Sequence, residues 1–397
     1  MTLGRALARA GLVAATTALF AGFGPAAPAD AHTVSGQGSS NFHTVVTGVA
    51  PATPGLTVRA VEDGSRLELT NATGREVIVL GYQGEPYLRL TPTAAATAAD
   101  PAGVYENETS STTYLNRSRQ YGAIPPTAND KGEPVRWKQI GRVRADGATV
   151  VRWHDHSAHY MSSDVTLPGP RSQRQVVFDW DAKLTVAGAP VTVTGQLVWV
   201  PGPPAWPWWV LVGVTGLATA ALGALARGPQ LIAVAGVAVV LVDLGHSVGI
   251  ALDQAGSFGA QASTFASGNV VEAVAWVLGI VGAGFALRRH IGGLFALGAA
   301  GAVIGAVGGL GDVGVFGHSS APFAGSLVLA RALTALTVAL GLGLVPACFL
   351  AVRRHDRAAA NGPDRAAADG PDQAQPAAGP RDDLDISDDL LGPRSGT

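Results

Sequence analysis

Residues 206–227 read WPWWVLVGVTGLATAALGALAR, and this stretch decides the class of fold. It carries no charge before its last residue, Arg227. About 20 apolar residues, at a helical rise of ~1.5 Å each, cover the roughly 30 Å hydrocarbon core of a bilayer. Tryptophans such as the three at its start are typical of the headgroup level of a membrane. The stretch therefore predicts a membrane-spanning helix that begins close to Trp206.

Four further apolar runs follow, and the whole chain has the composition of a membrane protein. Of its 397 residues, 47% are hydrophobic and only 14% are charged, which is too apolar for a soluble globular protein of this size. We predict a helical bundle over residues 204–352 with five spans. The spans cover residues 207–226, 230–252, 269–287, 291–312 and 324–352.

The short basic segments indicate how this bundle is oriented. They are Arg227, residues 288–290 and residues 353–357, and five spans place all three on one side. The positive-inside rule assigns that side to the cytoplasm. We therefore expect a multi-pass protein of the cell membrane with its N-terminal domain outside the cytoplasm and its tail, residues 353–397, inside. The tail is rich in Ala, Pro, Gly and Asp, which predicts disorder.

Residues 1–31 have the features of a secretory signal peptide. Two arginines precede an apolar run over residues 11–23, and the sequence ADA at residues 29–31 is a small-x-small cleavage site. Cleavage there would make His32 the first residue of the mature chain. An uncleaved signal anchor is the alternative, although the apolar run is short for a span.

Residues 32–203 predict an exported all-β domain. Short runs with strand-like alternation are separated by Gly, Pro, Asn and Asp, and no helical period is visible. The runs cover residues 56–61, 66–70, 76–80, 149–153, 175–180, 183–186 and 191–200. Many short strands with turn signals between them favour a β-sandwich. A long polar insertion, residues 91–134, either presents its tyrosines as a binding surface or covers an edge of the sandwich.

The sequence RWHDHSAHYM at residues 152–161 is the densest group of possible metal ligands. If residues 148–156 form a strand, His154 and His156 lie on one face about 7 Å apart. Asp155 then points to the opposite face. We therefore interpret Asp155 as a packing or supporting residue rather than a ligand.

Three further side chains complete the candidate metal site. A turn after His156 would bring His159 and Met161 over the same place, and His32 would add an imidazole beside a free amine. Imidazoles together with a thioether favour copper. Zinc more often takes a carboxylate or a thiolate in addition. The alternative is that the histidines have a structural or pH-sensitive role.

Five ionisable residues lie in or near the predicted spans, mostly toward their outer ends. They are Asp243, His246, Glu272, Asp312 and His318. Asp243 and His246 are three residues apart and so share a helical face, whereas a separation of six implies no shared face for the last pair. Ionisable groups are costly in hydrocarbon and usually face a partner or a cavity. Two interpretations are open: a site that receives the metal ion, or a hydrogen-bond network that holds the helices together.

The composition also argues against several functions. The single cysteine, Cys348, allows neither an intramolecular disulfide nor a thiolate metal cluster. No haem-ligand pair, flavin motif or nucleotide loop is visible in the sequence, so we do not expect an enzyme. A net charge of -2 does not favour nucleic acid as a partner. We expect a membrane protein that captures, transfers or senses a metal ion; an envelope scaffold or partner-binding protein is the alternative.

Three stretches carry a resemblance to known proteins. GYQGEPYLRL at residues 81–90, TYLNRSRQYG at 113–122 and WHDHSAHYM at 153–161 are similar to a group of actinobacterial envelope membrane proteins. The resemblance covers most of residues 80–210. It implies an exported β domain followed by five spans, and it implies no activity.

A looser resemblance is architectural. An exported β domain with an N-terminal histidine, joined to a histidine-bearing bundle, resembles the CopC and CopD copper-handling proteins. Of the CopC ligands only His32 matches by position, and Asp155 with His154 or His156 is a weaker match. This domain is longer than a CopC module, and the chain has fewer spans than CopD usually has.

Overall fold

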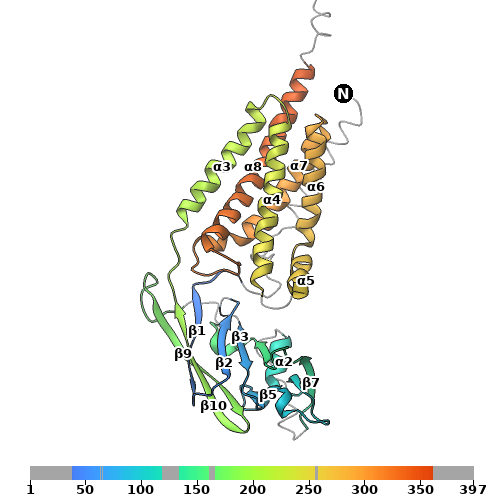
Figure 1. The fold of residues 1–397 in the computed structure, drawn as a ribbon. Helices are drawn as coiled ribbons and strands as arrows, with labels where there is room; N and C mark the ends of the chain where they lie inside the picture. Colours follow the sequence, from blue (N-terminus) through green and yellow to red (C-terminus); the bar gives the residue numbers. More distant parts are fainter. Residues whose placement is uncertain are drawn as a thin grey trace, which may run out of the picture. The chain divides into compact units, whose positions relative to one another are not determined.

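The computed structural model describes residues 38–62, 64, 66–118, 134–160, 166–254 and 258–360. Part of what the sequence predicts lies outside these residues. It comprises the signal peptide, the candidate ligands His32 and Met161, and residues 361–397 of the tail. Within the described chain, a sheet-rich N-terminal region is followed by long apolar helices (Figure 1).

The N-terminal region contains two antiparallel sheets. The larger has seven strands in the order β1(Phe42–Ala50), β10(Ala189–Trp199), β9(Gln175–Val186), β4(Val77–Leu80), β5(Pro86–Thr91), β6(Gly103–Asn107) and β7(Trp137–Gly141). The smaller has three in the order β2(Leu56–Val61), β3(Arg66–Asn71) and β8(Thr149–Trp153). Most neighbouring strands are consecutive in sequence, but β1 with β10, β9 with β4 and β3 with β8 are not. Strand β1 joins its sheet by pairing with β10.

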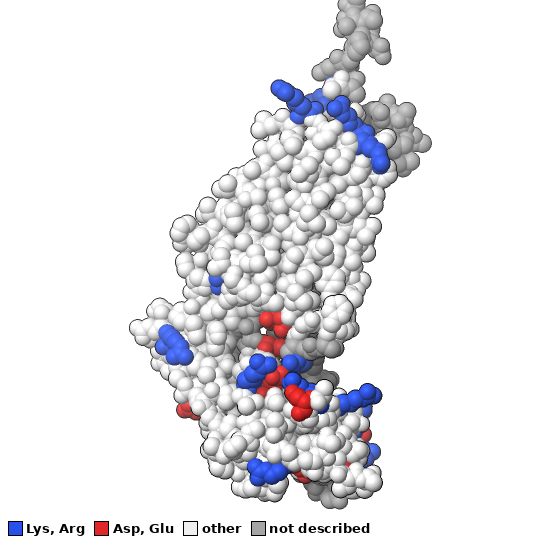
Figure 2. Space-filling model, in the orientation of Figure 1, with Lys and Arg blue, Asp and Glu red and all other residues white. Residues whose placement is uncertain are grey.

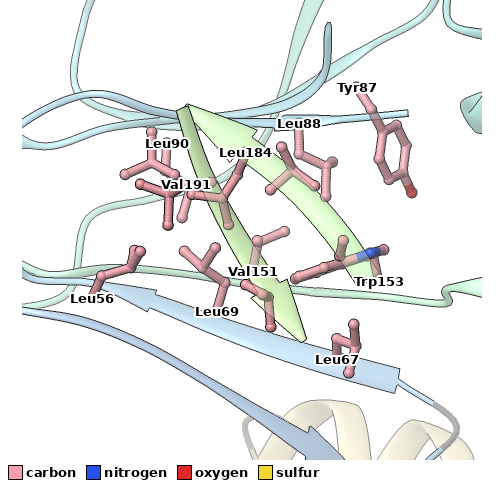
Figure 3. Close-up of a cluster of buried hydrophobic side chains, with 14 of the residues drawn as sticks. Leu56, Leu67, Leu69, Tyr87, Leu88, Leu90, Val151, Trp153, Leu184 and Val191 are labelled. Carbon is pink, nitrogen blue, oxygen red and sulfur yellow. The ribbon is translucent and has the colours of Figure 1, made fainter. Parts of the chain in front are cut away.

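Both sheets contribute side chains to one hydrophobic core. Leu69 and Val151 from the smaller sheet face Leu88 and Leu184 from the larger one, and all four are buried (Figure 3). In β8, residues alternate between buried and partly exposed because successive side chains point to opposite faces of a strand. The strand that this alternation predicted at residues 149–153 is confirmed, and its bounds in the structure are the same.

Two features of this region differ from the prediction. The runs at residues 175–180 and 183–186 form one continuous strand, β9, because the intervening Asp181 takes an outward position and leaves the alternation unbroken. The described part of the insertion contains the strand β6 and also a helix, α2(Ser111–Ser118). The side chain of Glu85 accepts hydrogen bonds from the hydroxyls of Ser110 and Ser111 and from the backbone of Thr112, all at the start of α2.

Five helices of the described chain are long and apolar enough to cross a membrane, and their bounds match the five predicted spans to within a few residues, apart from the extended end of the last. Four of them are regular α-helices: α3(Trp206–Leu225), α4(Gln230–Asp253), α6(Val270–Leu287) and α8(Leu327–Ala360). A shorter helix that the sequence did not predict, α5(Phe258–Gly268), lies between α4 and α6. Figure 2 shows a broad surface over the helices that carries almost no charged side chain.

The fourth apolar helix changes its winding twice. It begins as α7(Gly292–Val303), widens into a π-helix, η4(Ile304–Gly309), and tightens into a 3-10 helix, η5(Leu310–Phe316). Irregular turns of this kind often occur at functional sites. Here they end in the segment that carries Asp312.

The predicted tail requires a correction. Helix α8 continues to Ala360, so residues 353–360 are helical where the sequence predicted disorder. Arginine and alanine are good helix formers, and basic side chains near the end of a helix interact favourably with its dipole. The helix therefore extends beyond its apolar part.

Candidate functional site

The histidine-rich stretch begins where β8 leaves its sheet. Asp155 follows β8 and is buried; its carboxylate accepts hydrogen bonds from Trp153 Nε1 at 3.1 Å, Ser157 N at 3.0 Å and Ser157 Oγ at 2.6 Å. These bonds fold the chain into a 3-10 turn, η3(His156–Ala158). Asp155 therefore supports the turn by capping it. The sequence predicted a packing or supporting residue on the opposite face of a strand, and the capping role was not predicted.

The turn gathers three imidazole rings. The ring of His154 lies 4.7 Å from that of His156 and 4.5 Å from that of His159, measured between centroids. The strand argument for His156 is wrong, because β8 ends at Trp153 and does not reach residue 156. The predicted return of the chain after His156 is confirmed, since His159 stacks on His154 with 14° between the ring planes.

Contacts from three distant segments hold this cluster, which we call the histidine cluster. The hydroxyl of Tyr82 accepts from the backbone N–H of His156 at 2.8 Å, and the side chain of Asn116 donates to the carbonyl of His154 at 3.2 Å. The hydroxyl of Thr44 donates to the carbonyl of Ala158 at 2.7 Å. These contacts fix the backbone of the cluster.

Burial, and secondarily the charge of His154, lower the pKa of His156 below its ordinary value, against an opposing effect of Asp155. The neutral ring is the form that binds metal ions. Among the residues that the structure describes, no group of three or more His, Cys, Asp or Glu side chains is arranged to hold a metal ion. The three rings pack against one another, so a shared ion would require them to rotate.

A second polar group, inside the helical bundle, contains four of the five predicted intramembrane residues. Asp243 on α4 is fully buried and accepts a hydrogen bond from Trp276 Nε1 on α6 at 2.7 Å. Gly308 of the π-helix lies directly against Asp243. The approach is so close that a Cβ atom at position 308 would collide with Asp243 Oδ1. The wide turn therefore brings backbone up to the carboxyl group.

His246, which shares a helical face with Asp243, pairs with a different residue, Asp312. His246 Nε2 lies 2.9 Å from Asp312 Oδ2 of η5, and the side chains are 4% and 21% exposed. Glu272 is buried on α6, one helical turn before Trp276. The sequence placed Asp243 and His246 on one face but did not reveal either Trp276 or the pairing with Asp312.

The fifth residue, His318, lies apart in the loop after η5. Its Nδ1 is 2.7 Å from Ser39 Oγ, and a matching contact joins His43 Nε2 to Ser319 Oγ at 2.8 Å. Ser40 and Ser320 form an isolated antiparallel bridge between the same two segments. Burial lowers the pKa of His318. The structure thus associates His318 with the segment before β1 rather than with Asp312.

Sequence reasoning missed a buried cation. Arg331 on α8 donates from Nε to the carbonyl of Val315 at 3.0 Å and from a terminal nitrogen to that of His318 at 2.9 Å. It therefore binds the end of η5 and the loop that follows. A signal was available, because Arg331 is the sole lysine or arginine within the five predicted spans.

No protein-family model, no curated protein and no solved structure matches this chain. The two resemblances noted from the sequence therefore stay expectations. What the two polar groups do has to be argued from their own geometry.

Proposed function

We propose that this chain is a multi-pass membrane protein of the cell envelope that binds copper through His154, His156 and His159 and acts in capture, transfer or sensing of the ion. One observation carries the proposal: a single short turn gathers the three imidazoles in ring contact. Their backbone is held by contacts from separate parts of the domain, which keeps the three imidazoles close together, and binding of a shared ion would turn the rings toward it.

The donor chemistry favours copper over zinc. The carboxylate of Asp155 is engaged in capping the turn, and the only thiol, Cys348, is buried among the helices. This leaves imidazoles as the donors that the described residues offer at this place, and Met161, which the sequence adds as a possible thioether ligand, lies outside those residues. Copper accepts that set in either oxidation state, whereas structural zinc sites usually include thiolates.

The proposed location follows from the helices and the charges. The five apolar helices support a protein embedded in the membrane, and many of their side chains, such as Leu217 and Val274, are exposed as for contact with lipid. Arg227 and residues 288–289 lie at helix ends that the positive-inside rule assigns to the cytoplasm. The two sheets with a shared core support a β-sandwich. We place this sandwich outside the cytoplasm, where the signal peptide would export it.

The test is metal titration of the purified full chain in detergent with Cu(I), Cu(II) and Zn(II). We expect copper to bind more tightly than about 1 μM, and we expect the double variant His154→Ala/His156→Ala to weaken binding at least about tenfold. His290→Ala, which removes an exposed histidine outside the cluster, is the matched control. If no ion binds below micromolar, or if the double variant binds as the parent does, the proposal fails.

That outcome would favour the second candidate, an envelope scaffold or partner-binding protein. Its supporting observation is that Tyr82 and Tyr114 are each 42% exposed. Exposed tyrosines are typical of protein interfaces. In that case the histidine cluster would serve the fold of this surface.

A further inference from the structure

We infer that a cavity beside the loop after η5 binds a phosphate group, supplied either by the headgroup of a phospholipid or by a soluble phosphate. The cavity has a volume of about 400 Å³, and its lining comes from the segment before β1, the turn before β9, the end of β10 and that loop. Ligand cavities in proteins are commonly of this size. The inference takes from the proposed function the placement of the chain in a membrane, and it does not depend on copper binding.

The cavity lies where two of the apolar helices end. Its lining includes His318, which follows η5, and Trp199, which ends β10 shortly before α3 begins. The linker before α3 lies against the loop after η5, and Gly202 packs on Gly317 so closely that a Cβ atom at position 202 would collide with the carbonyl oxygen of Gly317. At the ends of spans a bilayer presents the phosphate-bearing headgroups of its lipids. The proposed membrane placement therefore puts lipid phosphates at the level of the cavity.

The polar side chains from the segment before β1 offer hydrogen-bond donors to this cavity. Asn41 Oδ1 already accepts from Ser319 N at 2.8 Å, and Ser40 Oγ already accepts from Phe42 N at 3.0 Å. Within the part of the chain that the structure describes, the amide N–H groups of Asn41 and the hydroxyl hydrogen of Ser40 are not used in these bonds. A ligand with acceptor oxygens fits such donors, and a phosphate has several.

Two basic side chains, Arg171 and His318, line the same cavity. A guanidinium has five N–H donors in a planar fork that matches a phosphate, so it can hold a partner in the chain and a phosphate together. Trp199 Nε1 donates to the carbonyl of Arg171 at 2.8 Å and so holds the turn that carries it. Ser39 Oγ lies 2.7 Å from Nδ1 of His318. When Ser39 donates this bond, the neutral imidazole carries its proton on Nε2 and is a further donor.

The electrostatics around the cavity favour an anion. Burial lowers the pKa of His318, and burial together with the charge of Arg174 lowers the pKa of His43. A carboxylate close to either imidazole would have the opposite effect on its pKa. A terminal nitrogen of Arg331 donates to the carbonyl of His318 and brings another positive charge to the loop. The described residues that line the cavity include neither Asp nor Glu.

Aromatic rings form the remaining wall of the cavity. Phe42 and Trp199 both line it, and their rings meet edge to face with centroids 5.2 Å apart. Aromatic rings of this kind are common at the headgroup level of membrane proteins, where one side of a ring meets apolar groups and the other meets polar ones. A phospholipid, with a glycerol backbone and acyl chains next to its phosphate, would use this wall as well as the donors.

The experiment follows thermal unfolding of the full chain in a neutral detergent. The probes are dioctanoyl phosphatidylglycerol, dioctanoylglycerol, which has the same chains without the phosphate, and sodium phosphate compared with sodium chloride at equal ionic strength. We expect phosphatidylglycerol to raise the unfolding temperature at concentrations at which dioctanoylglycerol does not, because a ligand that binds the folded state stabilises it. Sodium phosphate should have the same effect at higher concentration.

Two variants test whether the effect comes from this cavity. Asn41→Asp keeps an acceptor for Ser319 N but replaces the amide donors with a negative charge, and Arg171→Ala removes the guanidinium but keeps the carbonyl that Trp199 binds. We expect each substitution to weaken the apparent affinity for phosphatidylglycerol at least about fivefold, since charge-assisted hydrogen bonds to phosphate are lost. Arg75→Ala, at an exposed arginine between β3 and β4, is the matched control and should leave the affinity unchanged.

Circular dichroism of each variant separates a change of site from a loss of fold. The inference is overturned if neither phosphate probe stabilises the parent more than its own control does. It is equally overturned if folded Asn41→Asp and Arg171→Ala both respond as the parent does. A response to sodium phosphate without one to phosphatidylglycerol, lost in the two variants, would support the site and identify soluble phosphate as its ligand. Neither variant removes a proposed copper ligand, so copper titration of the same samples tells the failure of one proposal from the failure of the other.

Discussion

The indole of Trp276 donates to Asp243 across the interface between α6 and α4, with Nε1 and Oδ2 2.7 Å apart. Trp276 is uncharged and distant from Asp243 in the sequence, so the sequence did not predict it as a partner of this buried carboxyl group. The bond fixes the facing positions of two helices whose apolar side chains, such as Val240 and Ala275, share one core.

Replacing Trp276 with Phe tests this bond. The ring is largely retained while the donor is lost, and a buried polar group deprived of its partner costs about 1–3 kcal/mol. We expect the free energy of unfolding in detergent to fall by that amount. Trp209→Phe, on the exposed part of α3, is the control and should change it by less. Equal effects of the two substitutions would argue against a structural role for the bond.

Gly308→Ala tests the close contact of the π-helix with Asp243. The added methyl group would meet Asp243 Oδ1, so the carboxyl group or the helix must move. Overpacking of this kind costs about 1–3 kcal/mol, which a thermal unfolding curve would detect. Gly245→Ala is a matched control on α4, where an added Cβ meets nothing within 4 Å. It should be neutral or slightly stabilising, since alanine favours helix.

Glu85 predicts how the N-terminal region responds to acid. Burial by itself would raise the pKa of this carboxyl, but hydrogen bonds from Ser110, Ser111 and the Thr112 backbone outweigh it and hold the pKa below its ordinary value. A lowered pKa in the folded state contributes stability that is present above the unfolded pKa. That contribution is lost as the pH falls through the folded pKa.

We therefore expect Glu85→Gln to lower the free energy of unfolding at neutral pH by about 1–3 kcal/mol and to flatten its decrease below about pH 4.5. Denaturant titrations across that range measure both effects. Glu108→Gln, at a more exposed carboxylate 3.8 Å from Lys138, is the control and should have little effect. An unchanged acid dependence in Glu85→Gln would contradict this account.

Asp155→Ala tests whether the turn organises the histidine cluster. The variant loses the bonds to Trp153 and Ser157, and loss of a cap typically costs about 1 kcal/mol. Without the turn, His159 no longer stacks on His154, so copper affinity should fall although no proposed ligand is removed. Asp146→Ala, in a neighbouring exposed turn, should leave copper affinity at the parent value. Unaltered affinity in Asp155→Ala would show that the turn is not needed.

The helices and strands that the sequence predicted correctly are those that show a local periodicity of apolar residues. The span at residues 230–252 and the strand at 149–153 follow from apolar runs and alternation, and the structure reproduces them. Helix α2 was missed because Glu85, which binds its start, is more than 20 residues away. The pairing of His246 with Asp312 joins positions 66 residues apart. Such contacts are set by packing of the whole chain, and a single sequence does not reveal them.

The antiparallel bridge between Ser40 and Ser320 has a consequence for biosynthesis. A ribosome makes the chain from its N-terminus, so Ser40 is complete long before its partner. Strand β1 likewise waits for β10 before it can join its sheet. Because contacts of such long range are slow to form, the earliest synthesised segment of the described chain is also among the last to be fixed. Until then its edge is open to capture by chaperones or to pairing with other newly made chains.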